Sequence, residues 1–195
     1  MGLNAKNVYA PTPDQSATTG AVAVAPVGTA MPTDARAALP QTWDDGGYVS
    51  EDGLSVTITR STETIRDWSK AAVRTMLTEF AGQITLAFLQ VDEFAAKRVF
   101  GADNVTIVAA TREHGEQMKI SIGAELPPIE AWCFSMKDND ARVRVCVPRG
   151  QVTEVNQIDF KPDAGNIIGG TIDTYDDGTG HSIYFLYDDG EVIAG

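Results

Sequence analysis

Two long segments of the chain alternate apolar and polar side chains, which is the pattern of strands that bury one face. In residues 54–65, Leu54, Val56 and Ile58 alternate with serine and threonine, and this predicts a half-buried strand rich in β-branched residues. Residues 67–69 predict a turn, and a second segment follows over residues 75–88. Its apolar side chains share one parity: Met76, Phe80, Ile84, Leu86 and Phe88. Together the two segments predict a long hairpin that suits the wall of a barrel or a sheet shared between subunits.

The remainder of the chain predicts short strands separated by turns. Residues 20–27 alternate valine and alanine and end near Pro26, as a first strand. Further strands are expected at residues 105–109, 118–122, 129–136, 141–147, 151–160, 167–175 and 182–187. Turn-forming residues separate them, including Pro148-Arg149-Gly150. Regular short strands at this spacing indicate an all-β domain, a barrel or a sandwich.

One short helix interrupts the strands, at residues 92–100. Asp92 suits the N-cap, and Lys97 and Arg98 suit the last turn, where positive charge is favourable. Gly101 follows at the position where helices often need a positive φ. Phe94, Ala95, Val99 and Phe100 would cover an open end of the barrel.

Two segments outside these elements are long and contain little regular pattern. Residues 1–19 are polar and predict an N-terminal arm, either a frayed tail or a segment that orders on a neighbouring subunit, and residues 20–195 predict the β domain. Residues 28–47 form a long connection with one short helical turn expected over residues 35–39. Trp43 in this connection is either an anchor for a partner or part of the chain's own core.

Composition restricts the classes of function. The length of 195 residues fits one domain. The net charge of −12 argues against a protein that binds nucleic acid tightly, because phosphate binding depends on lysine and arginine. Cys133 and Cys146 could pair if their strands were neighbours, but a lone pair specifies no disulfide framework, and two buried free thiols are the expectation. The chain contains no apolar run of membrane-spanning length, and residues 1–19 contain no apolar core of an export signal.

Candidate chemistry is sparse. His114 and His181 lie in separate turns with no partner at the spacing of metal ligands, and no serine lies in a nucleophile elbow. Asp138-Asn139-Asp140 and Asp176-Asp177-Gly178 are turns in which carboxylates usually accept backbone N–H groups. We therefore expect no catalytic, cofactor-binding or metal-binding residues.

Several blocks of sequence together carry a resemblance to a known family: YVSEDGLSVTITR (48–60), RTMLTEF (74–80), FGADNV (100–105), ARVRVCVPRGQVTEV (141–155) and DTYDDGTGHSIYFLYDDG (173–190). They resemble the major tail proteins of long-tailed, siphovirus-type phages, particularly those of actinobacteria. The resemblance covers most of the chain from Gly20 onward. It implies a β-barrel tail tube subunit with long inter-subunit loops, stacked as hexameric rings around a channel through which DNA is ejected into the host.

The resemblance also implies partners and a location. Partners would be further copies of the chain, the tape measure, tail terminator and tail tip proteins, and transiently passing double-stranded DNA, with no membrane insertion. The protein would be made in the host bacterial cytoplasm and reside in the phage tail of the virion. The candidate inter-subunit or stacking residues are Trp43, Asp44, Asp45, Tyr48, Glu51, Asp52, Arg142 and Arg144.

The roles of the charged candidate residues remain open between alternatives. Arg142 and Arg144 share one face of a strand, which is either solvated and paired across the sheet or forms salt bridges to acidic loops of another subunit, such as Asp44-Asp45. Glu79, on the polar parity of the second long strand, is a candidate for the channel surface. A hexamer would carry a net charge of 6 × −12 = −72, which would repel passing DNA and prevent it from binding.

The main alternative is a secreted β-sandwich module that binds a carbohydrate or a receptor. Such a module needs a compact aromatic patch and an export signal, whereas Trp43, Trp68 and Trp132 are scattered along the chain. A small hydrolase on a β scaffold is a third possibility, and it lacks a convergent catalytic set.

Overall fold

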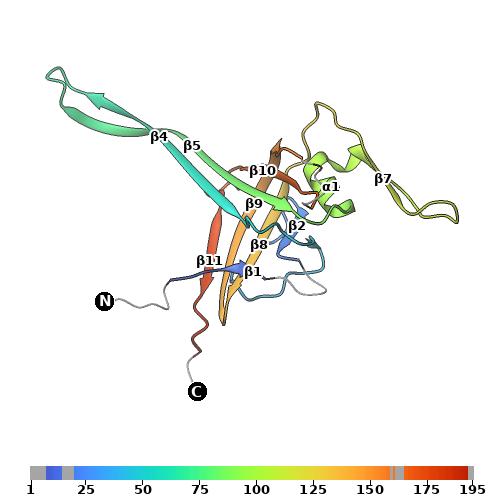
Figure 1. The fold of residues 1–195 in the computed structure, drawn as a ribbon. Helices are drawn as coiled ribbons and strands as arrows, with labels where there is room; N and C mark the ends of the chain where they lie inside the picture. Colours follow the sequence, from blue (N-terminus) through green and yellow to red (C-terminus); the bar gives the residue numbers. More distant parts are fainter. Residues whose placement is uncertain (1–7, 15–19, 159, 161–164, 193–195) are drawn as a thin grey trace.

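The computed structural model describes residues 8–14, 20–158, 160 and 165–192. Figure 1 shows a curved sheet, one short helix beside it and a hairpin that projects far from the rest. The strands are β1 (Thr12–Pro13), β2 (Val22–Pro26), β3 (Asp44–Asp45), β4 (Ser55–Arg66), β5 (Ala72–Phe88), β6 (Val105–Val108), β7 (Gln117–Ile120), β8 (Glu130–Asp138), β9 (Ala141–Val155), β10 (Ile168–Thr174) and β11 (Tyr184–Asp188). The helices are α1 (Glu93–Phe100) and the 3-10 turn η2 (Ala102–Asn104). The predicted all-β fold with one short α-helix is confirmed.

The main sheet has the order β3-β2-β8-β9-β10-β5-β4, and β6 pairs with β7 in a separate ribbon. Beside this path, β1 pairs with β8 and β11 pairs with β9. Within the described residues the order therefore begins at β3 and ends at β4, so hydrogen bonds do not close the sheet. Strands at open ends keep backbone donors and acceptors that another chain can pair with.

The central strand β9 is longer than the sequence pattern predicts. We expected a turn at Pro148-Arg149-Gly150, and this expectation is wrong: β9 continues through these residues to Val155. The register with β8 shifts between Glu130 and Trp132, and this irregularity takes up the extra residues around the proline. Gly150 has no room for a side chain, because a Cβ there would lie 2.8 Å from Ile172 and 2.9 Å from Trp132.

Two apolar clusters lie on opposite faces of β2, β8 and β9, because successive side chains of a strand alternate between faces. The larger cluster packs Val24, Trp132 and Val147 against β5 and α1. The smaller cluster contains Ala23, Cys133 and Cys146, and Trp43 from the long connection covers it. The connection of residues 28–47 is thus held on the face of the sheet that carries the smaller cluster, opposite to the larger cluster.

The helix follows the sequence prediction closely. The Asp92 carboxylate accepts a hydrogen bond from Ala95 N at 2.9 Å, and Gly101 ends the helix with φ of 92°. Ala95, Ala96, Val99 and Phe100 are buried. The turn expected over residues 35–39 does not form a helix. Instead, the Asp34 carboxylate accepts hydrogen bonds from the backbone N–H groups of the next residues, which favours a local turn.

Cys133 and Cys146 face each other across β8 and β9, with 3.1 Å between their sulfur atoms. Both are free and buried, as predicted. The hydrogen bond between them and their burial raise the pKa of the Cys133 thiol. Neither sulfur is accessible from solvent, so both act as small core residues.

Candidate assembly interface

The outer part of the β4–β5 hairpin, residues 59–81, has no other strand beside it among the described residues. β10 pairs with β5 only from Gly82 to Phe88, so the chain beyond this point forms a free two-stranded arm. We call residues 59–81 the outer hairpin. The nine residues from Ala72 to Phe80 alone reach about 30 Å. An isolated two-stranded ribbon is marginally stable in water, and the outer hairpin gains no support from a third strand among the described residues.

A β-bulge determines which side chains share a face of the outer hairpin. Ser61 pairs with Glu79, whereas Thr62 pairs with Leu77, so Thr78 is the extra residue. Beyond the bulge the parity of β5 reverses. Leu77 therefore joins the face of Phe80, and the prediction that Met76 shares that face is wrong.

The face that continues from the core carries exposed apolar side chains. Arg60 lies over the Phe80 ring at 5.6 Å, which shows that both belong to this face. Leu77 is 58% exposed and Phe80 46% exposed. Ile58, at the base of the hairpin, extends the same row. We call this set, Ile58, Leu77 and Phe80, the apolar row.

The opposite face of the hairpin is polar from Ser61 and Glu79 towards the base and continues across the sheet, whereas Ile65 and Met76 lie on it nearer the tip. The Ser61 hydroxyl donates to Glu79 at 3.2 Å, and the Gln83 amide donates to Asp173 of β10 at 2.9 Å. Thr85 and Thr171 lie next in the row, with 3.4 Å between their hydroxyls. Glu79, the predicted channel residue, thus belongs to a continuous polar surface spanning β10 and β5.

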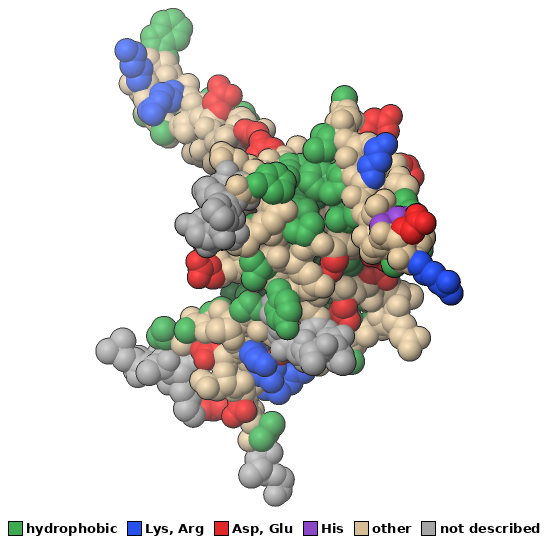
Figure 2. Space-filling model, turned by 45° about the vertical axis from the view of Figure 1, so that its right-hand side comes forward, with side chains coloured by type: hydrophobic (Ala, Val, Ile, Leu, Met, Phe, Trp, Pro, Cys, Tyr) green, Lys and Arg blue, Asp and Glu red, His purple; other side chains and the backbone are tan. Residues whose placement is uncertain are grey.

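The tip of the hairpin carries a fully exposed tryptophan among basic residues. Trp68 lies in the turn, and Arg66, Lys70 and Arg74 surround it in sequence against a single carboxylate, Asp67. The Ser69 hydroxyl and the Ala71 N–H donate to Asp67 and hold the pKa of this carboxyl below its usual value. Figure 2 shows Lys and Arg side chains gathered at the end of the projecting arm.

The acidic loop candidates divide into buried and exposed residues. Trp43 is only 5% exposed and packs in the smaller cluster, so its side chain belongs to the chain's own core. Asp44 is exposed and binds Arg98 of α1 at 2.6 Å. Asp45 is also exposed in part, and desolvation and the neighbouring Asp44 raise its pKa. Arg98 also binds Glu130, so one arginine ties α1 to both β3 and β8.

Tyr48, Glu51 and Asp52 lie in the segment that leads into β4, and all three are exposed. Gly53, which follows them, has φ of 68°, a conformation that favours glycine. Their side chains are accessible, and their role in contacts between subunits stays a prediction.

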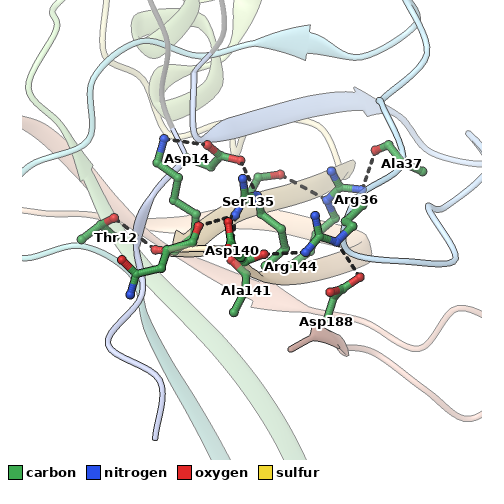
Figure 3. A network of polar contacts seen from close by, with 12 residues as sticks. Thr12, Asp14, Arg36, Ala37, Ser135, Asp140, Ala141, Arg144 and Asp188 are labelled. Atoms are coloured by element: carbon green, nitrogen blue, oxygen red, sulfur yellow. Dashed lines mark hydrogen bonds and ion pairs between the residues drawn. The ribbon is translucent and has the colours of Figure 1, made fainter. Parts of the chain in front are cut away.

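The two arginines of β9 have different surroundings, and Figure 3 shows the contacts of Arg144. Arg144 is 6% exposed, and it donates to the carbonyls of Asp34 and Ala37 and to the Ser135 hydroxyl. It therefore fastens the long connection to the sheet. Arg142 is half-buried and lies 3.6 Å from Asp14. In the isolated subunit neither arginine pairs with Asp44 or Asp45.

Part of the N-terminal arm lies on the chain's own sheet. β1 pairs with the end of β8, and Ala10 N donates to Asp138 at 2.9 Å. Residues 1–7 and 15–19 lie outside the described residues, so the prediction of a flexible arm stays a prediction.

Sequence reasoning missed two features of this surface. The role of Arg98 as a link between Asp44 and Glu130 depends on contacts 54 and 32 residues apart in the sequence, which no local pattern reveals. The basic tip did have a signal, because Arg66, Lys70 and Arg74 surround Trp68 in a chain of strongly negative charge.

The described residues offer little for catalysis or cofactor binding. No group of three or more His, Cys, Asp or Glu side chains in them is placed to hold a metal ion. His114 and His181 lie in separate turns and contact Gly115 and Thr179. None of the helices in the described chain is long and apolar enough to cross a membrane.

Comparison with known proteins identifies the family. The chain matches the family model described as phage tail tube protein over residues 1–194. A search of curated proteins finds no match to the chain. The family is a structural one, located in the virion tail, and its fold is rich in β-structure, as observed here. The chain therefore belongs to the phage tail tube protein family.

Proposed function

We propose that this protein is the major tail tube subunit of a siphovirus-type phage, and that it assembles into stacked hexameric rings around a channel for DNA. The observation that carries this proposal is the outer hairpin. It is a free two-stranded arm with large apolar side chains in solvent, on a chain that otherwise buries its core well. Exposed apolar patches and open strand edges of this kind mark protein interfaces.

The polar surface around Glu79 supports an orientation of the subunit in the ring. Its side chains are hydroxyls, amides and carboxylates, and the hexamer carries 6 × −12 = −72 charges. A polar and acidic channel surface repels DNA phosphates, so DNA passes without binding. In this arrangement the polar face of β5 lines the channel.

Ring stacking is assigned to residues 28–53 and the N-terminal arm of residues 1–19. Asp44, Asp45, Tyr48 and Arg142 supply exposed or partly exposed side chains for this contact, and Glu51 and Asp52 are assigned to contacts between neighbouring copies. Trp43 and Arg144 act indirectly, because they hold the connection in place on the sheet. The ends of the tube would meet the tail terminator and tail tip proteins, and the tape measure protein would occupy the channel during assembly.

Sedimentation velocity across a concentration series tests the ring. The subunit mass is 20.8 kDa, so a hexamer has a mass of about 125 kDa (6 × 20.8 kDa). We expect a discrete species of that mass, or multiples of it, to grow with concentration. A dimer that saturates with no larger species would contradict the hexameric ring.

A further inference from the structure

A groove beside the base of the hairpin is lined largely by apolar side chains. It consists of two adjoining hollows of about 480 and 370 Å³, which share Pro11, Leu54 and Met136 in their walls. In the smaller hollow, Phe185 and Tyr187 of β11 form one wall and remain 41% and 60% exposed. We call these two hollows the β1–β11 groove. Exposed apolar patches of this kind mark interaction sites.

The larger hollow contains a polar group that lacks a partner. Ser50 lines it and is 4% exposed, and its hydroxyl has no hydrogen-bond partner among the described residues. A buried hydroxyl without a partner is costly. An occupant that forms a hydrogen bond with the Ser50 hydroxyl, as donor or as acceptor, would remove that cost.

The rim of the same hollow is acidic. Glu51 and Asp52 both line it, and both are exposed. The tip of the outer hairpin is basic, with three basic residues and one acidic residue between Ile65 and Thr75. The chain thus carries a basic, apolar arm and an acidic, apolar groove whose chemistry is complementary.

The arm cannot occupy the groove of its own subunit. Figure 1 shows the outer hairpin running away from the sheet to the upper left, whereas β1 and β11 lie below the hairpin base. We propose that the outer hairpin of one subunit occupies the β1–β11 groove of the next, with the apolar row against Phe185 and Tyr187 and the basic tip near Glu51 and Asp52. This inference rests on the proposed function and names the contact that joins neighbouring copies.

The contact is heterologous, because each subunit gives its arm and receives another at a different surface. Contacts of this kind produce closed rings when the rotation closes and open filaments when it does not. The hydroxyls of Thr62, Thr64 and Thr75 on the same face of the arm are available to Ser50.

Cysteine crosslinking between two different variants tests the contact. One variant carries Leu77→Cys in the arm and the other carries Tyr187→Cys in the groove, and both are full-length chains. Native Cys133 and Cys146 are fully buried and do not react with a short bis-maleimide reagent in the folded protein. We expect a crosslinked dimer in the mixture and none with either variant alone.

The matched control is Glu63→Cys, on the opposite face of the hairpin at nearly the same distance from the tip. Mixed with Tyr187→Cys, it should give no dimer. Equal crosslinking from Glu63→Cys and Leu77→Cys would overturn the assigned face. Rings or tubes that form without any Leu77–Tyr187 crosslink would overturn the groove contact and leave the proposed function standing. Crosslinked open chains that never close into rings would support the contact and contradict the hexameric tube.

Charge reversal gives an independent measurement. Arg66→Glu with Arg74→Glu in the arm variant should abolish the crosslink, and Glu51→Lys with Asp52→Lys in the groove variant should do the same. Combining both sets should restore the crosslink, since the charges are again opposite. Circular dichroism confirms that each variant is folded. Loss of the crosslink that the combined variants do not restore would overturn the assigned position of the tip.

Discussion

Arg144 is the residue that determines where the longest connection of the chain lies. Its guanidinium has three acceptors, and two of them are carbonyls of the connection. Charged hydrogen bonds of this kind contribute more than neutral ones. The neighbouring Arg142 has the same charge and the same strand face, and its ion pair with Asp14 is partly exposed. The two arginines therefore make unequal contributions to stability.

Replacement of Arg144 tests this assignment. Arg144→Met keeps much of the volume but leaves the carbonyls of Asp34 and Ala37 without their donor, so we expect a loss of about 2 kcal/mol of unfolding free energy. Arg142→Met, the control, should lose less than about 1 kcal/mol. Urea denaturation measures both values. Equal losses of unfolding free energy from the two variants would show that the hydrogen bonds from Arg144 to residues 34–37 contribute no more than the ion pair of Arg142.

Glu130 predicts a specific pH dependence. Burial raises the pKa of Glu130 above its usual value of 4.5, although the adjacent Arg98 acts in the opposite direction. A carboxyl with a raised pKa in the folded state contributes stability that is fully present below pH 4.5 and is lost as the pH rises through the folded pKa. The unfolding free energy of the native protein minus that of Glu130→Gln should therefore fall as the pH rises through this range. A difference that increases with pH would contradict the assigned direction.

At the scale of elements, the outer hairpin is an addition to a sheet that is complete without it. The core contains residues of β5 only from Ile84 onward, and the apolar row of the arm is exposed. The arm therefore contributes little to the buried core of the subunit, and its proposed role is association with other copies.

A shortened hairpin separates these two roles. Deleting residues 59–81 and joining Ile58 to Gly82 through Asn-Gly leaves a tight two-residue turn. We expect the variant to fold, with a thermal midpoint close to that of the native protein, and to remain monomeric at every concentration. Circular dichroism and light scattering measure the two properties. A variant that assembles like the native protein would show that the arm is not the assembly element.

The sequence predicted most elements because they depend on local patterns. Alternation located β4 and β5, and the cap residues located α1 to within one residue. The bulge at Thr78 and the passage of β9 through Pro148 were missed, because both depend on the register of a neighbouring strand. The burial of Trp43 and Arg144 was undetermined for the same reason, since their partners come from distant segments.

For the whole molecule, the distribution of charge matters more than any single residue. The net charge of the chain is −12. The polar face around Glu79 carries carboxylates, and the basic side chains on this face of the hairpin lie near its tip. A surface of this kind has no affinity for phosphate.

Reversing charge on this face should convert the proposed channel surface into a DNA-binding surface. Glu63→Lys with Glu79→Lys changes each subunit by +4 charges, because each substitution replaces −1 with +1. Assembled particles of this variant should retain linear double-stranded DNA at about 50 mM salt and release it at about 200 mM. Cosedimentation measures retention. Asp103→Lys in η2 with Glu113→Lys in the connection between β6 and β7 adds the same charge away from this face and serves as the control. Equal retention by both variants would mean that the polar face does not line the channel.

Negative-stain electron microscopy across a concentration series tests the central claim most directly. A tail tube subunit should form hollow rings or tubes of uniform width with a central channel, and their number should rise with concentration. Tail-tip complex, added in a parallel series, supplies an initiator for tube growth. Separate particles of 20.8 kDa at every concentration, with and without that complex, would contradict assembly into a tube.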